Sequence, residues 1–187
     1  MSVTTKMTAR QFSLLGEDPP GVRLELVDGE IAVSPSPTPD HSRVDRRLGR
    51  ILLNHLIEND LGELLGDTET VFGEYDVRRP DLHYFIKSRV GLINWGKPIE
   101  APPDLCIEII SPSSVRIDRR DKFRLYATGK VPHYWLIDPE DKTIEAFILN
   151  EGVYHPAGQG RDNDVVHLPP FPELGIPLGE LWPPLPS

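Results

Sequence analysis

Proline placement limits where this chain can form long helices and central strands, because proline breaks both. The 187 residues include 20 prolines, yet none lies within residues 40–79 or within residues 113–131. Seven prolines lie in residues 169–187. The two proline-free stretches therefore predict the long regular elements. Residues 169–187 are expected to form a proline-rich C-terminal tail that follows the surface without regular structure.

The composition is that of a soluble globular protein. Hydrophobic residues make up 39% and charged residues 26% of the chain, and we expect a single domain over residues 1–187. No apolar run approaches the roughly 20 residues of a membrane span, and Met1–Leu15 lacks the apolar core of a secretory signal. The single cysteine, Cys106, excludes an internal disulfide and a cysteine zinc site. We therefore expect a cytoplasmic protein that does not bind membranes.

The charge balance is acidic. Twenty Lys and Arg residues stand against 29 Asp and Glu residues, which gives a formal net charge of −9. Strong non-specific binding of nucleic acid relies on an excess of Lys and Arg, so the balance argues against it. It does not exclude a local basic patch or a bound divalent cation.

Two patterns in the first half of the chain predict a hairpin and a long helix. Asp28-Gly29 lies between alternating runs in residues 22–34, which is typical of a two-residue β-hairpin. His41–Asn59 has the apolar spacing of a helix. Its apolar face consists of Val44, Leu48, Ile51, Leu52 and Leu56. The opposite side carries Arg43, Arg46, Arg47 and Arg50. This arginine stripe is either a solvated face or a contact surface for a phosphate backbone.

Strand patterns and a second helix follow. The expected strands are Glu69–Arg78, Asp81–Lys87, Leu105–Ile110, His133–Asp138, Thr143–Leu149 and Gly152–His155. The second helix is expected over Val115–Thr128, with Ser114 as its N-cap. This order of elements predicts an α/β (α+β) fold in which helices flank a mixed β-sheet.

Glu108 is the first candidate functional residue, because it interrupts the apolar run LCIEII. Strand alternation places it on one face with Cys106 and Ile110, and both faces of the strand are otherwise apolar. A buried carboxylate is costly unless it is paired, protonated or bound to a metal. Three explanations stay open: a half-exposed face, a structural salt bridge, or a metal-binding or catalytic role.

A metal site needs a second carboxylate near Glu108. Asp104 shares its strand and face, but four residues at ~3.3 Å each place it about 13 Å away, so it is expected to be a strand-entry turn residue. Asp81 is the better partner, because it opens the run DLHYFI, whose strand could pair beside LCIEII. Lys122 lies mid-helix on the side of Tyr126 and can reach over the sheet. The alternative for Lys122 is an ordinary lysine that extends to solvent.

Pro80-Asp81, then Glu108 in a strand, then a lysine resembles the PD-(D/E)XK nuclease superfamily. The usual lysine position, two residues after the acid, is Ile110 here, and Lys122 fits the variant in which the amine lies on the following helix. The segments ELVDGEIAVSPSPTPDH, RRPDLHYFI, APPDLCIEIISPSS, DRRDKFRLYATG and VPHYWLIDP occur in this order. Together they resemble the Uma-two family of restriction-endonuclease-like proteins, over nearly the whole chain.

The resemblance implies a restriction-endonuclease-like core with a divalent-metal site. It assigns Asp81, Glu108 and Lys122 as acid, acid and amine. His41 and Glu30 also match recurrent family positions and are auxiliary candidates. The residues are then expected to bind Mg²⁺ or Mn²⁺ through Asp81, Glu108 and the backbone carbonyl of Ile109.

The expected activity is metal-dependent hydrolysis of phosphodiester bonds in nucleic acid, with DNA as the expected substrate. The metal would activate water and neutralise charge on phosphorus, and Lys122 would orient the water or stabilise the transition state. A homodimer is an expectation, since nucleases of duplex DNA often dimerise. The alternative is an inactive or regulatory binding module on the same fold, because function resides in the site and not in the fold.

Overall fold

A six-stranded mixed sheet forms the centre of the molecule. The computed structural model describes residues 6–34, 36–111, 114 and 117–183. The strand order is β10-β9-β8-β7-β6-β3. The strands are β3 (Gly62–Gly66), β6 (Leu82–Ile86), β7 (Leu105–Ile109), β8 (His133–Asp138), β9 (Thr143–Asn150) and β10 (Val153–Arg161). β7 and β8 run parallel, and the other neighbouring pairs of this sheet run antiparallel. The mixed sheet predicted from the sequence is confirmed.

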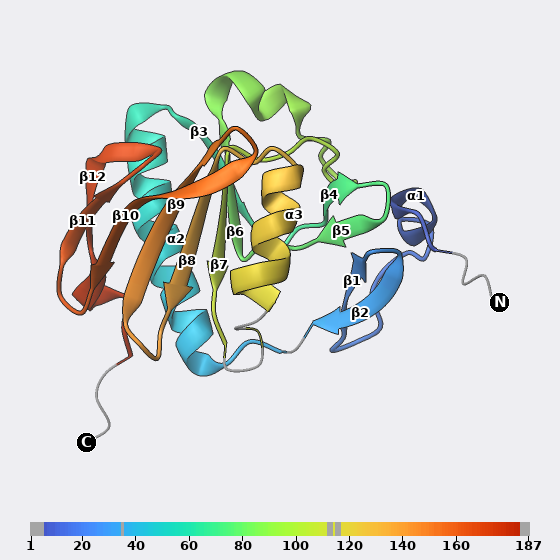
Figure 1. The fold of residues 1–187 in the computed structure, drawn as a ribbon, viewed down its shortest axis with the longest axis horizontal. Coiled ribbons are helices and arrows are strands. Elements are labelled where there is room, and N and C mark those ends of the chain that lie inside the picture. Colours follow the sequence, from blue (N-terminus) through green and yellow to red (C-terminus); the bar gives the residue numbers. More distant parts are fainter. Residues whose placement is uncertain (1–5, 35, 112–113, 115–116, 184–187) are drawn as a thin grey trace.

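Helices cover both faces of this sheet (Figure 1): α2 (Pro39–Asn59) lies on one face and α3 (Phe123–Thr128) on the other. The apolar side chains of α2 pack against Leu105, Ile107 and Ile109 of β7. On the other face, Tyr126 of α3 belongs to a separate apolar cluster with Cys106. The two faces of β7 therefore face two different cores, as the strand alternation predicts.

The boundaries of α2 follow from local chemistry. Thr38 is the N-cap, and its hydroxyl accepts a hydrogen bond from the backbone N–H of His41. Pro39 suits the first helical position, so the helix starts two residues before the predicted His41. Asp60 ends the helix in the left-handed conformation, with φ 54°. Although α2 has 21 residues, no helix in the described ranges is long and apolar enough to cross a membrane.

A second, smaller sheet has the order β2-β1-β5-β4. Its strands are β1 (Arg23–Val27), β2 (Glu30–Ser34), β4 (Thr70–Gly73) and β5 (Asp76–Arg78). The predicted N-terminal hairpin is confirmed: Asp28 and Gly29 both have positive φ, as its two-residue turn requires. The short helix α1 (Ala9–Phe12) packs on this sheet through Phe12.

Two predicted elements are divided in the structure. The single strand predicted over Glu69–Arg78 is wrong, because the chain turns after Gly73 and β5 pairs antiparallel with β4. The helix predicted over Val115–Thr128 consists of a π-helix, η2 (Ile117–Lys122), that continues into α3. Val115 and Arg116, the first residues of that prediction, lie outside the described residues. A 3₁₀-helix, η1 (Lys87–Leu92), follows β6.

The prediction of a C-terminal tail without regular structure is wrong. β11 (Val165–Leu168) pairs with β12 (Phe171–Pro177), and the 3₁₀-helix η3 (Leu178–Glu180) follows. The buried side chains of this segment join the core around α2. They are Phe171, Ile176, Leu178, Leu181 and Trp182. A two-stranded sheet tolerates prolines at positions that donate no ladder hydrogen bond, so the prolines do not prevent a strand here.

Candidate active site

A small polar pocket lies where the start of α2, the start of β6, the end of β7 and the small sheet meet. Its carboxylates are Glu25, Asp67, Asp81, Glu108 and Asp118. Its basic side chains are Arg23, His41, Arg79 and Lys122. The pocket therefore contains all three members of the acid, acid and amine set expected from the sequence.

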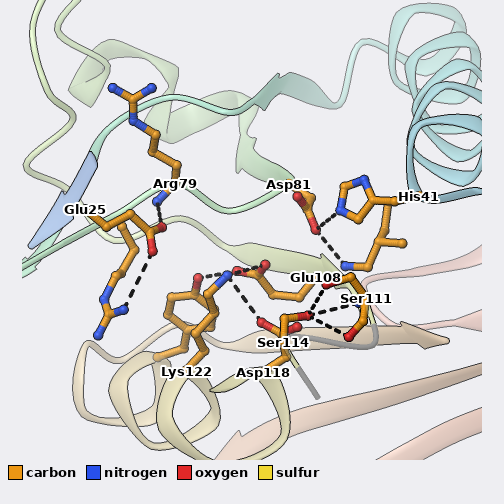
Figure 2. Close-up of polar contacts among 12 residues, drawn as sticks. Glu25, His41, Arg79, Asp81, Glu108, Ser111, Ser114, Asp118 and Lys122 are labelled. Carbon is orange, nitrogen blue, oxygen red and sulfur yellow. Dashed lines mark hydrogen bonds and ion pairs between the residues drawn. The ribbon is translucent and has the colours of Figure 1, made fainter. Parts of the chain in front are cut away.

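Asp81 enters this pocket because of the register between β6 and β7. Leu82 is opposite Ile107 in this antiparallel pair, so Asp81, one residue earlier, comes level with Glu108. The Oδ2 atom of Asp81 accepts the backbone N–H of Ile109 at 2.7 Å and lies 3.1 Å from Nε2 of His41 (Figure 2). The carboxylate is thus fixed between the sheet and the first turn of α2.

Glu108 is buried, with 1% of its surface exposed. Its Oε2 atom accepts a hydrogen bond from Nζ of Lys122 at 2.7 Å, and Oε1 accepts one from the hydroxyl of Tyr126. The alternative of a half-exposed face is therefore wrong. The salt bridge is present, and it lies inside a pocket with further carboxylates.

Three residues at intervals of four along η2 and α3 face this carboxylate: Asp118, Lys122 and Tyr126. Nζ of Lys122 lies 3.3 Å from Oδ1 of Asp118, which is itself buried. A π-helix has more residues per turn than an α-helix, so side chains four apart come closer to one line along it. The hydroxyl of Tyr134 in β8 donates to the backbone carbonyl of Asp118 and ties η2 to the sheet. Such π-helical segments are frequent at functional sites.

The pocket has five carboxylates and four basic side chains, and burial together with their charges shifts the pKa values of its inner groups. Burial raises the pKa of Glu108 well above its ordinary value; Lys122 opposes this effect, and the charges of Asp81 and Asp118 add to it. Burial also raises the pKa of Asp118, against the effect of Lys122. Burial alone would lower the pKa of Lys122, but Glu108 and Asp118 more than offset it, so the pKa is raised and the amine is protonated at neutral pH.

His41 belongs to the same charge network. Burial acts to lower its pKa, but the hydrogen bond and charge of Asp81 outweigh burial, and Asp45 and Asp118 contribute, so the pKa is raised. The raised pKa favours the charged form of His41 beside Asp81, and His41 lies at the opposite end of the site from Lys122 (Figure 2). It contacts Asp81 and not Glu108, which suits a role in holding Asp81.

Glu25 is a pocket residue that sequence reasoning missed. It is buried on β1, where its carboxylate accepts the backbone N–H of Arg79 at 2.9 Å and lies 3.8 Å from Arg78. The auxiliary candidate Glu30 is exposed on β2 and does not line the pocket. In RLELV, strand alternation places Glu25 on the face opposite the leucines, which predicts an exposed side chain and gives no signal of a pocket residue. Asp118 and Tyr126 were detectable only as residues spaced by four from Lys122.

The arginine stripe lies away from the pocket. At 100° per residue, the stripe is on the side of α2 opposite His41, and none of Arg43, Arg46, Arg47 and Arg50 lines the pocket. Nε of Arg43 donates to the backbone carbonyl of Trp182, and Arg50 lies 3.6 Å from Glu180. Two of its four members therefore hold the C-terminal segment. A phosphate contact by the stripe stays a prediction.

The oxygen-rich donor set suits a hard divalent cation such as Mg²⁺ or Mn²⁺. Asp81 lies directly before β6, Glu108 lies on the neighbouring β7, and the N–H of Ile109 points at Asp81. Because the N–H and carbonyl of a strand residue point to the same edge, the Ile109 carbonyl also lies on this side. Among the described residues, however, no three His, Cys, Asp or Glu side chains form a ready-made metal site. The oxygens of Glu108 are directed instead at Lys122 and Tyr126.

Comparison with known proteins identifies the family. A family model named Uma2 and described as "Putative restriction endonuclease" matches residues 9–179. The chain belongs to the Uma2 family. The resemblance stated from its sequence motifs is thereby confirmed.

A solved structure agrees with the Uma2 fold. It is described as a "putative nuclease belonging to DUF820" from Anabaena variabilis ATCC 29413, and it matches this chain with a TM-score of 0.76. The match covers 94% of this chain and 97% of that chain, at 22% sequence identity. At this identity the likeness shows the fold alone. The search of curated proteins found no match.

Proposed function

We propose that this Uma2 protein is a metal-dependent nuclease that hydrolyses phosphodiester bonds in nucleic acid, with DNA as the expected substrate. The observation that carries the proposal is the convergence of Asp81, Glu108 and Lys122. They come from the start of β6, from β7 and from η2, and they line one pocket. A salt bridge that only stabilises the fold would need Lys122 and Glu108 but would not need Asp81 in the same pocket.

The size and polarity of the pocket support a phosphate-sized substrate group. Its volume is about 80 Å³, well below the ~300 Å³ at which sites for whole small molecules begin. A phosphodiester group with a few waters fits such a space, whereas a nucleoside does not. The substrate would then present its backbone from the protein surface, as an internal phosphodiester of a polynucleotide does.

The roles follow from the positions. Asp81, Glu108 and the Ile109 carbonyl would hold Mg²⁺ or Mn²⁺, which would supply Lewis-acid activation of water and charge neutralisation at phosphorus. Lys122 is protonated at neutral pH, so it would act as a donor to the phosphate or the attacking water and not as a base. His41 would keep the Asp81 carboxylate in position through its contact at 3.1 Å.

Cleavage assays with Mg²⁺ or Mn²⁺ on single- and double-stranded DNA and RNA test this function. Asp81→Ala and Glu108→Ala should each abolish cleavage, while Asp104→Asn, at the other end of β7, should retain it. Activity that survives in both alanine variants contradicts the assignment. If no substrate is cleaved and calorimetry detects no Mn²⁺ binding, the binding-module alternative is favoured.

A further inference from the structure

Glu108 has both of its carboxylate oxygens occupied by donors of its own chain. Lys122 holds Oε2 at 2.7 Å, and the buried hydroxyl of Tyr126 holds Oε1. A metal ion and an ammonium group on the same carboxylate repel each other, so each weakens the binding of the other. In the structure a metal ion at Glu108 would therefore have to compete with these two donors.

The Lys122 ammonium lies among several carboxylates. It contacts the carboxylates of Glu108 and Asp118 at 2.7 and 3.3 Å, and the charges of Glu25 and Asp81 also act on it. Glu108 and Asp118 are both buried, and an unpaired buried carboxylate is costly. In this arrangement the lysine supplies the neutralising charge that a metal would otherwise supply.

Tyr126 is less able than Lys122 to yield its place. Its ring is fully buried and packs against Phe72 and Tyr134, with ring centroids 4.7 and 5.4 Å apart. The Lys122 side chain is flexible, and its head borders the pocket. When Glu108 exchanges one partner, the lysine contact at Oε2 is therefore the one that opens.

We propose that Lys122 is a built-in competitor of the metal: its ammonium occupies the cation position at Glu108 and leaves it when a divalent ion binds. The inference rests on the proposed function, since it concerns the same metal site. It adds that metal binding and the release of Lys122 into the pocket are one exchange. The amine is then free to contact the phosphate only in the metal-loaded protein.

Calorimetric titration with Mn²⁺ tests this competition without any activity assay. Lys122→Met keeps the length of the side chain and removes its charge, so it should bind Mn²⁺ about tenfold or more tightly than the wild type. Lys97→Met removes one charge from an exposed lysine and is the matched control. It should bind Mn²⁺ as the wild type does.

A second measurement uses the wild-type protein and does not depend on the folding of a variant. Acetylation of lysines by acetic anhydride is quantified by mass spectrometry with and without Mn²⁺. Mn²⁺ should increase the labelling of Lys122 several-fold because the amine leaves its ion pair, and it should leave the labelling of Lys97 unchanged.

The outcomes separate this inference from the proposed function. Tighter Mn²⁺ binding by Lys122→Met, or binding by this variant alone, supports the competition. Equal or weaker binding by Lys122→Met, or unchanged labelling of Lys122 in a wild type that binds Mn²⁺, overturns the competition and leaves the metal site standing. Absence of Mn²⁺ binding by both proteins overturns the competition and the metal site together.

Discussion

β7 has an acid near each end, and the two acids differ in what surrounds them. Asp104, just before the strand, pairs with Arg89 at 2.6 Å and accepts the backbone N–H of Ile86 at 2.9 Å. Glu108, near the other end, pairs with Lys122 at 2.7 Å. By distance alone, the two ion pairs are nearly the same.

The two acids differ in how deeply they are buried and in how much negative charge surrounds them. The side chain of Asp104 is 17% exposed, and its two oxygens join the chain between β6 and β7 to the sheet. The side chain of Glu108 is 2% exposed and lies in a pocket with other buried carboxylates. A close ion pair therefore does not mark a functional site by itself. Negative charge in excess of what the fold needs, at the wall of a pocket, is the more informative sign.

The largest expected contrast is in catalysis. Glu108→Gln removes one charge and keeps the shape, and it should lower the rate of metal-dependent cleavage by about 10³-fold. Asp104→Asn makes the same change at the other end of β7 and should leave the rate within about twofold. Single-turnover cleavage of a labelled DNA measures both. Equal losses of cleavage rate in the two variants would contradict the assignment of Glu108, and not Asp104, to the active site.

The second contrast is in stability. Lys122→Ala leaves Glu108 buried without its cation and should cost about 3–5 kcal/mol of unfolding free energy at pH 7. Arg89→Ala removes the cation from the more exposed Asp104 and should cost about 1 kcal/mol or less. Urea denaturation gives both values. A similar cost for the two alanine variants would contradict the difference in burial.

The third prediction asks whether water reaches the sheet between Asp104 and Glu108. His83 of β6 lies there, because it is opposite Cys106 of β7. Burial lowers the pKa of His83 to about 4, so between pH 6.5 and 4 the unfolded chain binds a proton that the folded protein does not. Stability is therefore lost as the pH falls through this window, by about 3 kcal/mol. His83→Gln should lack this loss in urea titrations at pH 7 and pH 4. Parallel losses in both proteins would show that water reaches the imidazole.

The smallest contrast concerns two buried tyrosines. Tyr126→Phe removes the hydroxyl donor to Glu108, and Tyr154→Phe removes the donor to the backbone carbonyl of Val131. Each should cost about 1–3 kcal/mol of stability, because a buried acceptor loses its partner. Tyr126→Phe alone should also slow cleavage, by about tenfold or more. Cleavage rates and melting curves of both variants separate positioning of Glu108 from general support of the core.

Much of the fold and the main site residues could be predicted from local pattern. The apolar spacing of His41–Asn59 and the Asp28-Gly29 turn are properties of short segments, and both predictions hold. Glu108 was detectable because a carboxylate among apolar strand residues is costly wherever the strand lies. Asp81 was harder, since its approach to Glu108 depends on the register of two strands.

The rest depends on contacts between distant segments. Glu25 reaches the pocket because the small sheet lies beside it, and no pattern near β1 encodes that placement. Lys122 contacts Glu108 and Asp118 from a π-helix, which periodicity at 3.6 residues does not predict. In the C-terminal segment, prolines suggested irregular chain, but the burial of Phe171 and Trp182 against α2 outweighs that local tendency.

The C-terminal segment also affects the order in which the protein can fold during synthesis. The core around α2 is completed by Leu181 and Trp182, whose indole donates to the backbone carbonyl of Asp162. A chain still being translated carries α2 and the central sheet with this part of the core uncovered. The apolar surface is shielded only after the last of these residues leaves the ribosome. Folding of this domain is therefore expected to finish only once the segment up to Trp182 is available, with exposure to aggregation until that moment.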